Sequence, residues 1–174
     1  MSAVADVICI VLLALIAAQD FKSRLISWWL LPLLIAALTI AGASGTPVRT
    51  IGFYFLVNSL LLGGQVLLIM TWFAMKNRKW TNIVNTAVGL GDLLFLLCIA
   101  AAFSPLNFIA VYVAGLTLTL LAVLLIRALR PGALKEIPLA GTLSLLMIGF
   151  CAWRLFSPGI DFYSDTALLN RLTF

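Results

Sequence analysis

Two aspartates are the residues of this sequence best placed to do chemistry. Asp20 closes an apolar stretch, and Asp92 opens another in the run Gly89–Asp92. A pair of carboxylates can hold a water molecule between them, with one ionised as general base and the other protonated as general acid. Two close carboxylates do not easily ionise together, so such a pair shares one proton. The sequence therefore contains the parts of a hydrolytic aspartyl dyad, if the chain brings them together.

Composition removes most other catalytic chemistries. The sequence has no histidine, which excludes Ser-His-Asp triads, Cys-His pairs and histidine-ligated metal or haem sites. Cys9, Cys98 and Cys151 each lie inside an apolar run and are far apart in the chain. This placement is typical of buried free thiols rather than of a disulfide framework or a zinc cluster.

The elements that must position the two aspartates are apolar helices. Of 174 residues, 64% are hydrophobic and 10% are charged, with a mean hydropathy of +1.18, which is typical of a membrane protein. About 20 apolar residues make one membrane span, so the chain has room for about six. Apolar runs bounded by charge, Pro and Gly predict an all-α polytopic bundle in residues 1–156, followed by a polar extracytoplasmic tail over 157–174. The predicted spans are roughly 4–20, 26–42, 51–75, 86–103, 106–127 and 138–156.

The distribution of the basic residues predicts how this bundle is oriented in the membrane. Asp6 precedes the first apolar run and basic residues follow it, the reverse of a signal peptide. Most basic residues fall in the loops after spans 1, 3 and 5, which makes those loops cytoplasmic and both termini extracytoplasmic. The net charge of +5 then needs no nucleic acid partner. The cytoplasmic set is Lys22, Arg24, Lys76, Arg78, Lys79, Arg127, Arg130 and Lys135, against Arg49, Arg154 and Arg171 on the other side.

The orientation places Asp20 and Asp92 at similar depth, because span 1 ends and span 4 begins at the cytoplasmic face. A carboxylate within a span costs up to about 2.5–3.5 kcal/mol on insertion scales and usually faces the bundle interior. Asp92 lies near a helix N-terminus, where negative charge is favoured, so it is the better candidate for the ionised member. Gly89 and Gly91 are expected to allow a positive φ and close approach of a substrate peptide. The other acidic residues, Asp6, Glu136, Asp161 and Asp165, are expected in loops or termini.

Simpler interpretations of the same residues exist. The Gly-x-Gly-Asp run is also typical of a loop that ends in a helix N-cap, and Asp20 has Lys22 and Arg24 nearby for a surface salt pair. In span 3, Asn58 and Gln65 lie seven residues apart and so share a face, which predicts interhelical hydrogen bonds.

The ordered motifs resemble those of type IV prepilin peptidases and archaeal preflagellin peptidases, which are membrane aspartyl proteases of the GxGD type. The stretch from Asp20 to Ile26 is similar to their D-x-x-x-R/K-x-I-P-N pattern, Gly89–Asp92 matches G-x-G-D, and residues 137–141 (Ile-Pro-Leu-Ala-Gly) resemble a late I-P-x-x-G element. The chain departs from these patterns at three positions, with Ser27 and Trp28 in place of Pro-Asn and Leu94 in place of a lysine. It has no CxxC pairs, so it looks like the short, peptidase-only form.

The resemblance implies an aspartic endopeptidase of the inner (cytoplasmic) membrane that needs no cofactor. Its substrate would be a prepilin-like protein, cut at the cytoplasmic face between a short basic leader and an apolar helix. Two alternatives are a catalytically inactive membrane scaffold related to the family and a proton or cation transporter that uses the same carboxylates. The residues implied are Asp20 and Asp92 as catalytic groups, and Gly89, Gly91, Lys22 and Arg24 for substrate binding.

Overall fold

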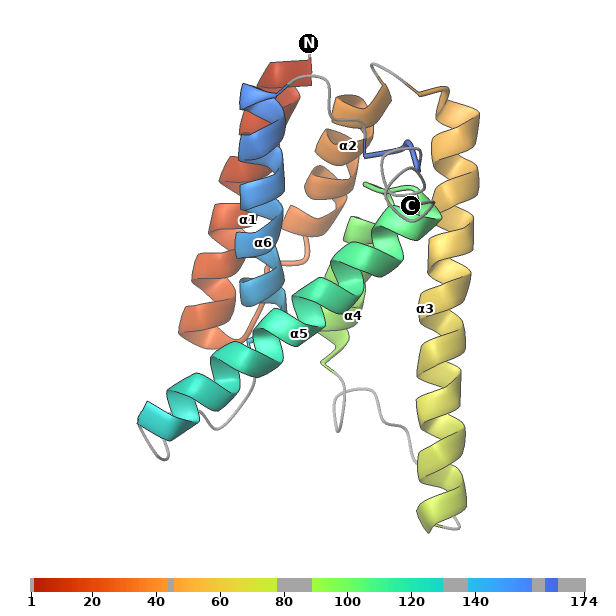
Figure 1. Ribbon diagram of the computed structural model, residues 1–174, viewed down its shortest axis with the longest axis vertical. Coiled ribbons are helices and arrows are strands. Elements are labelled where there is room, and N and C mark those ends of the chain that lie inside the picture. Colours follow the sequence, from red (N-terminus) through yellow and green to blue (C-terminus); the bar gives the residue numbers. More distant parts are fainter. Residues whose placement is uncertain (1, 44–45, 78–88, 130–137, 158–161, 166–174) are drawn as a thin grey trace, which may run out of the picture.

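The predicted all-α architecture is confirmed. The computed structural model describes residues 2–43, 46–77, 89–129, 138–157 and 162–165, and within these ranges it contains six helices and no strand (Figure 1). The helices are α1 (Ser2–Ser23), α2 (Leu30–Ala43), α3 (Val48–Asn77), α4 (Leu90–Ala100), α5 (Pro105–Leu129) and α6 (Leu139–Phe156).

Four of these helices, α1, α3, α5 and α6, are long and apolar enough to cross a membrane, which is compatible with a multi-pass membrane protein. The other two are shorter than predicted. At 1.5 Å per residue, α2 with 14 residues and α4 with 11 reach about 21 and 17 Å, against about 30 Å for a hydrocarbon core. The reason at α2 is that residues 25–27 are irregular and Trp28 and Trp29 form a turn, so the helix starts only at Leu30.

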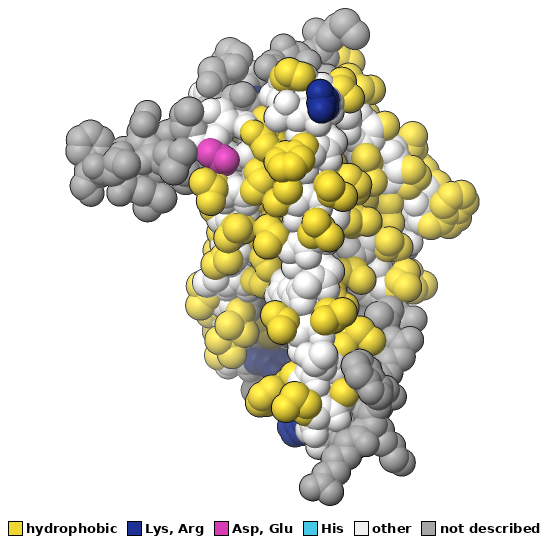
Figure 2. All heavy atoms as spheres, turned by 90° about the vertical axis from the view of Figure 1, so that its right-hand side faces the viewer, with side chains coloured by type: hydrophobic (Ala, Val, Ile, Leu, Met, Phe, Trp, Pro, Cys, Tyr) yellow, Lys and Arg dark blue, Asp and Glu magenta, His cyan; other side chains and the backbone are white. Residues whose placement is uncertain are grey.

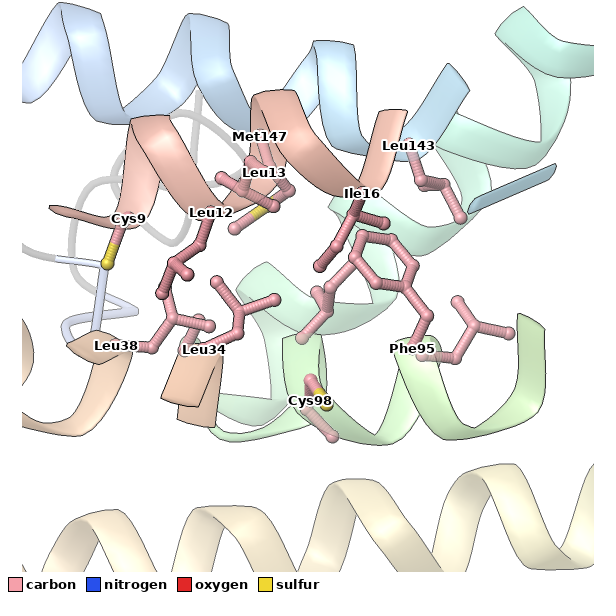
Figure 3. Close-up of a cluster of buried hydrophobic side chains, with 14 of the residues drawn as sticks. Cys9, Leu12, Leu13, Ile16, Leu34, Leu38, Phe95, Cys98, Leu143 and Met147 are labelled. Atoms are coloured by element: carbon pink, nitrogen blue, oxygen red, sulfur yellow. The ribbon is translucent and has the colours of Figure 1, made fainter. Parts of the chain in front are cut away.

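The helices pack around one apolar core. The most extensive contacts are those of α1 with α6 and with α2, while α4 contacts α2, α3 and α6. Figure 1 shows α1 and α6 side by side, with α3 at the opposite edge. Ile16 of α1, Phe95 of α4 and Leu143 of α6 point into the same buried cluster (Figure 3). Cys9, Cys98 and Cys151 are buried free thiols, as predicted.

Much of the outer face of α3 is apolar. Figure 2 shows many hydrophobic side chains on the side of the molecule that carries α3. Phe53, Leu60 and Leu68 are each more than half exposed on this helix. Such an exposed apolar surface is the kind that lipid covers in a membrane protein.

Polar side chains fix α3 to its neighbours. The Asn58 amide donates to the carbonyl oxygens of Ala100 and Phe103 at 2.9 and 3.0 Å, and the Tyr112 hydroxyl of α5 donates to Gln65 Oε1 at 2.8 Å. The predicted interhelical hydrogen bonds of Asn58 and Gln65 are therefore confirmed. The Asn58 bonds satisfy the Ala100 carbonyl at the end of α4 and the Phe103 carbonyl in the turn that follows, since the last carbonyl groups of a helix have no helical partner.

The described part of the C-terminal tail is packed rather than free. Phe162 and Tyr163 are buried, although the tail was predicted to be polar. The Ser104 N–H donates to the Phe162 carbonyl at 3.1 Å, and the Tyr163 hydroxyl donates to the Ala101 carbonyl at 2.6 Å. These bonds tie residues 162–165 to the turn between α4 and α5.

Candidate carboxylate site at the start of α6

Asp20 and Asp92 meet at the first turn of α6. The Gly141 N–H donates to Asp20 Oδ2 at 2.7 Å, and the Ala140 N–H donates to Asp92 Oδ1 at 3.1 Å. Asp20 is 5% exposed, whereas Asp92 is partly exposed. Because the two amides are consecutive, the carboxylates are neighbours, and they interact electrostatically. The predicted proximity of the two side chains is confirmed, with α6 as the element that joins them.

The start of α6 needs these acceptors. The first amides of a helix have no intrahelical acceptor, and Pro138 at the N-cap provides no side-chain cap. The second and third amides of the helix therefore donate to carboxylates from α1 and α4. Since the N-terminal end of a helix carries a partial positive charge, α6 also stabilises negative charge on the pair.

Two glycines make room for the carboxylates. A Cβ on Gly141 would lie 3.0 Å from Asp20 Oδ2 and 3.1 Å from Phe21 Cε2, and a Cβ on Gly89 would lie 2.9 Å from Asp92 Oδ2. At Gly91 the nearest atom, Ile26 Cδ1, is at an ordinary 3.7 Å.

The expectation that Gly89 and Gly91 supply positive φ angles is wrong. Gly89 has φ −65° and ψ 130°, an extended conformation that other residues also adopt. Gly91 lies inside α4 and has no positive φ. The need for glycine at position 89 is therefore steric, because the Asp92 carboxylate folds back against the Gly89 backbone.

One of the two simpler interpretations is borne out in part. Gly89 is the N-cap of α4 and Asp92 lies in its first turn, so the Gly-x-Gly-Asp run does begin a helix, but Asp92 Oδ1 also accepts a hydrogen bond from α6. The ion pair found among the described residues joins Arg154 and Asp6, not Asp20 and its basic neighbours. Both carboxylates instead point at α6.

The basic residues after Asp20 differ in their surroundings. Lys22 is exposed in the last turn of α1. Arg24 follows the helix with φ 58° and interacts electrostatically with Asp92. The loop beyond it is held by a hydrogen bond of 2.9 Å from the Ser27 N–H to Gln19 Oε1. Of the three positions that depart from the family patterns, Ser27 is partly buried, and Trp28 and Leu94 are exposed.

Sequence reasoning missed the ion pair between Asp6 and Arg154. Asp6 was expected in the N-terminal segment, but it lies within α1, buried, and pairs with the Arg154 guanidinium of α6. That guanidinium also lies 4.9 Å from the Phe162 ring centroid. The pair joins α1 to α6 near the opposite ends of these helices from Asp20 and Gly141. Asp165 accepts a hydrogen bond from Ser104, while Glu136 and Asp161 lie outside the described residues.

Sequence reasoning also missed the Ala140 and Gly141 amides as parts of the site. Backbone donors have no side-chain signature, and the late Pro-x-x-Gly pattern was the one signal that pointed to them. Among the residues that the structure describes, no group of three or more Cys, Asp or Glu side chains is arranged to hold a metal ion.

Comparisons with models of protein families, with curated proteins and with solved structures find no match to this chain. The geometry of the site and the motifs around it are therefore the observations that point to a function.

Proposed function

We propose that this protein is a membrane-embedded aspartyl endopeptidase that removes the short basic leader of prepilin-like proteins at the cytoplasmic face of the inner membrane. One observation carries the proposal: carboxylates from two helices, far apart in sequence, are held side by side on consecutive amides of a third helix. The resemblance of the surrounding motifs to prepilin peptidases supplies the substrate class.

The chemistry needs a water molecule between the carboxylates. In the proposed reaction, ionised Asp92 takes a proton from this water as its oxygen attacks the scissile carbonyl carbon, and protonated Asp20 gives its proton to the carbonyl oxygen. The resulting gem-diol collapses when the C–N bond breaks. The amide nitrogen then receives the proton held by Asp92, and one hydroxyl proton returns to Asp20. The products are a carboxylic acid and an amine, and both aspartates regain their starting states.

The position of Asp92 supports this assignment of roles. Asp92 lies in the first turn of α4, where the N-terminal end of the helix favours negative charge. Asp20 is then the partner that carries the shared proton.

The proposed topology has six membrane crossings, with the N-terminus outside. The shorter helices α2 and α4 are then the second and fourth crossings, and the cluster of basic residues marks the cytoplasmic side. An apolar substrate helix would lie in the bilayer beside the bundle, with its cleavage junction at the depth of the dyad. Gly89, Gly91, Lys22 and Arg24 surround this position in the proposal.

Coexpression with prepilin-like proteins from the same genome tests the function. Loss of the leader is followed by gel mobility and mass spectrometry for the wild type, Asp20→Asn and Asp92→Asn. Asp165→Asn is the matched control, because it removes a carboxylate from another part of the molecule. We expect both site variants to insert in the membrane and to lose cleavage, while the control retains it. Cleavage that survives in either site variant contradicts the dyad, and an intact leader with the wild type favours a scaffold.

A further inference from the structure

The backbone at Arg24 is in a conformation that favours glycine. Its φ of 58° places it in the left-handed region directly after α1, and its N–H donates to the Asp20 carbonyl at 3.1 Å. This is a common helix ending in which the residue after the last turn is usually Gly, since other residues meet a steric penalty there. The backbone conformation at this position therefore disfavours arginine relative to glycine.

The side chain of Arg24 is also in an unfavourable position. Its Nη1 atom is buried and has no hydrogen-bond acceptor among the residues that the structure describes. A buried donor without a partner destabilises the fold. The neighbouring Lys22 is exposed, so a basic side chain at this end of α1 does not have to turn inward.

The Arg24 guanidinium lies close enough to the carboxylate pair to interact electrostatically with Asp92. Arg24 and Asp20 are the charged residues that interact electrostatically with Asp92. The same loop reaches the start of α4, where Ile26 Cδ1 lies 3.7 Å from the Cβ position of Gly91. The loop is thus anchored both to α4 and, through the Asp20 carbonyl, to α1.

We propose that Arg24 is a substrate-contacting residue whose Nη1 donates a hydrogen bond to a main-chain carbonyl oxygen of an extended peptide bound between Asp20 and Asp92. This inference rests on the proposed function and names the group that the site recognises. An extended peptide has free carbonyl oxygens, whereas a helical one uses them internally. A peptide carbonyl satisfies the buried donor, which explains why the chain keeps an arginine where its backbone favours glycine.

The substitution Arg24→Gly tests the function of the side chain without destabilising the fold. It removes the guanidinium and places glycine at a position whose backbone conformation favours it. We expect its thermal stability in detergent to equal or exceed that of the wild type. Its kcat/KM for leader cleavage should fall about 10- to 100-fold, the range for losing a hydrogen bond that involves a charged group. Arg24→Lys should recover this loss only in part, because an ammonium group lacks the planar guanidinium donors. The matched control is Lys76→Gln, which removes an exposed charge from the last turn of α3 and should leave cleavage unchanged.

Binding provides a second measurement. A fluorescent substrate peptide that spans the cleavage junction is titrated against Asp92→Asn in vesicles, with and without Arg24→Gly. We expect Arg24→Gly to weaken binding of this peptide about 10-fold or more.

Three results would overturn the inference. The first is wild-type kcat/KM in Arg24→Gly; the second is a loss of cleavage no larger than that in Lys76→Gln. The third is a loss that disappears in vesicles without anionic lipid, which would assign Arg24 to lipid headgroups. In each case the wild type still cleaves, so the proposed function stands. Absence of cleavage by the wild type itself would instead contradict the proposed function and Arg24's role with it.

Discussion

Replacement of Gly141 by alanine tests the geometry of the candidate site without changing any charged group. The new Cβ would lie 3.0 Å from Asp20 Oδ2 and 3.1 Å from a ring carbon of Phe21. The Phe21 ring is 47% exposed and has room to move. The Asp20 carboxylate is buried and held by the Gly141 N–H at 2.7 Å, so the methyl group must lengthen that hydrogen bond.

The structure offers a matched control in the same helix. Gly149 is exposed in α6, and a Cβ there meets no atom within 4 Å. Both substitutions gain the intrinsic helix preference of alanine, up to about 1 kcal/mol. Only Gly141→Ala also weakens the hydrogen bond that the Gly141 N–H donates to Asp20, and a bond to a neutral acceptor contributes about 0.5–1.5 kcal/mol. We expect Gly141→Ala to be less stable than Gly149→Ala by about 0.5–1.5 kcal/mol.

Thermal unfolding in one detergent, followed by tryptophan fluorescence, gives the order of stability. Leader cleavage gives the second readout, and kcat for Gly141→Ala should fall by up to about 10-fold, since 1.4 kcal/mol corresponds to a factor of ten. Gly149→Ala should cleave as the wild type does. Equal stability and equal activity for the two alanine variants would refute the claim that the Gly141 amide positions Asp20.

Two further substitutions test the packing of α6. Asp6→Asn leaves the buried Arg154 without its counter-charge and should destabilise the protein by about 3–5 kcal/mol; a melting temperature in detergent close to that of the wild type would contradict a buried ion pair. Gly115→Ala places a methyl group against the buried Leu143 side chain and should cost about 1–3 kcal/mol. Gly63→Ala, which meets no neighbour, serves as its control, and similar melting temperatures for the pair would argue against close α5–α6 packing.

The number and rough positions of the helices follow from the sequence because apolar runs of this length, bounded by charge and Pro, have few other stable structures. The residues at which the helices begin and end cannot be predicted from the sequence. The predicted second helix starts four residues early because residues 26–29 carry no charge and contain no Pro or Gly that would mark a boundary, and only the turn at Trp28 separates them from α2. The charge distribution placed Asp20 and Asp92 at one end of the bundle, which is where the structure has them.

The partners of these carboxylates could not be predicted. Every face of α1 and α6 is largely apolar, so the sequence does not indicate which face points inward. The pairing of Asp6 with Arg154 joins residues at opposite ends of the chain, and rotation of the helices decides it. The Ala140 and Gly141 amides are backbone groups, and their role depends on where α6 begins. Glycine is required at position 89 because the Asp92 carboxylate lies against its backbone, and not because of its backbone angles. The sequence does not show this close approach.

The central claim is that Asp20 and Asp92 lie side by side, and cross-linking of introduced thiols tests it most directly. The double variant Asp20→Cys/Asp92→Cys is made in a background in which Cys9, Cys98 and Cys151 are replaced by alanine, and membranes are treated with a short bis-maleimide. Mass spectrometry of the digested protein should identify the peptide pair that joins positions 20 and 92. The control, Asp20→Cys/Asp165→Cys, should give no cross-linked pair. Efficient labelling of both thiols without a link between positions 20 and 92 would contradict the account.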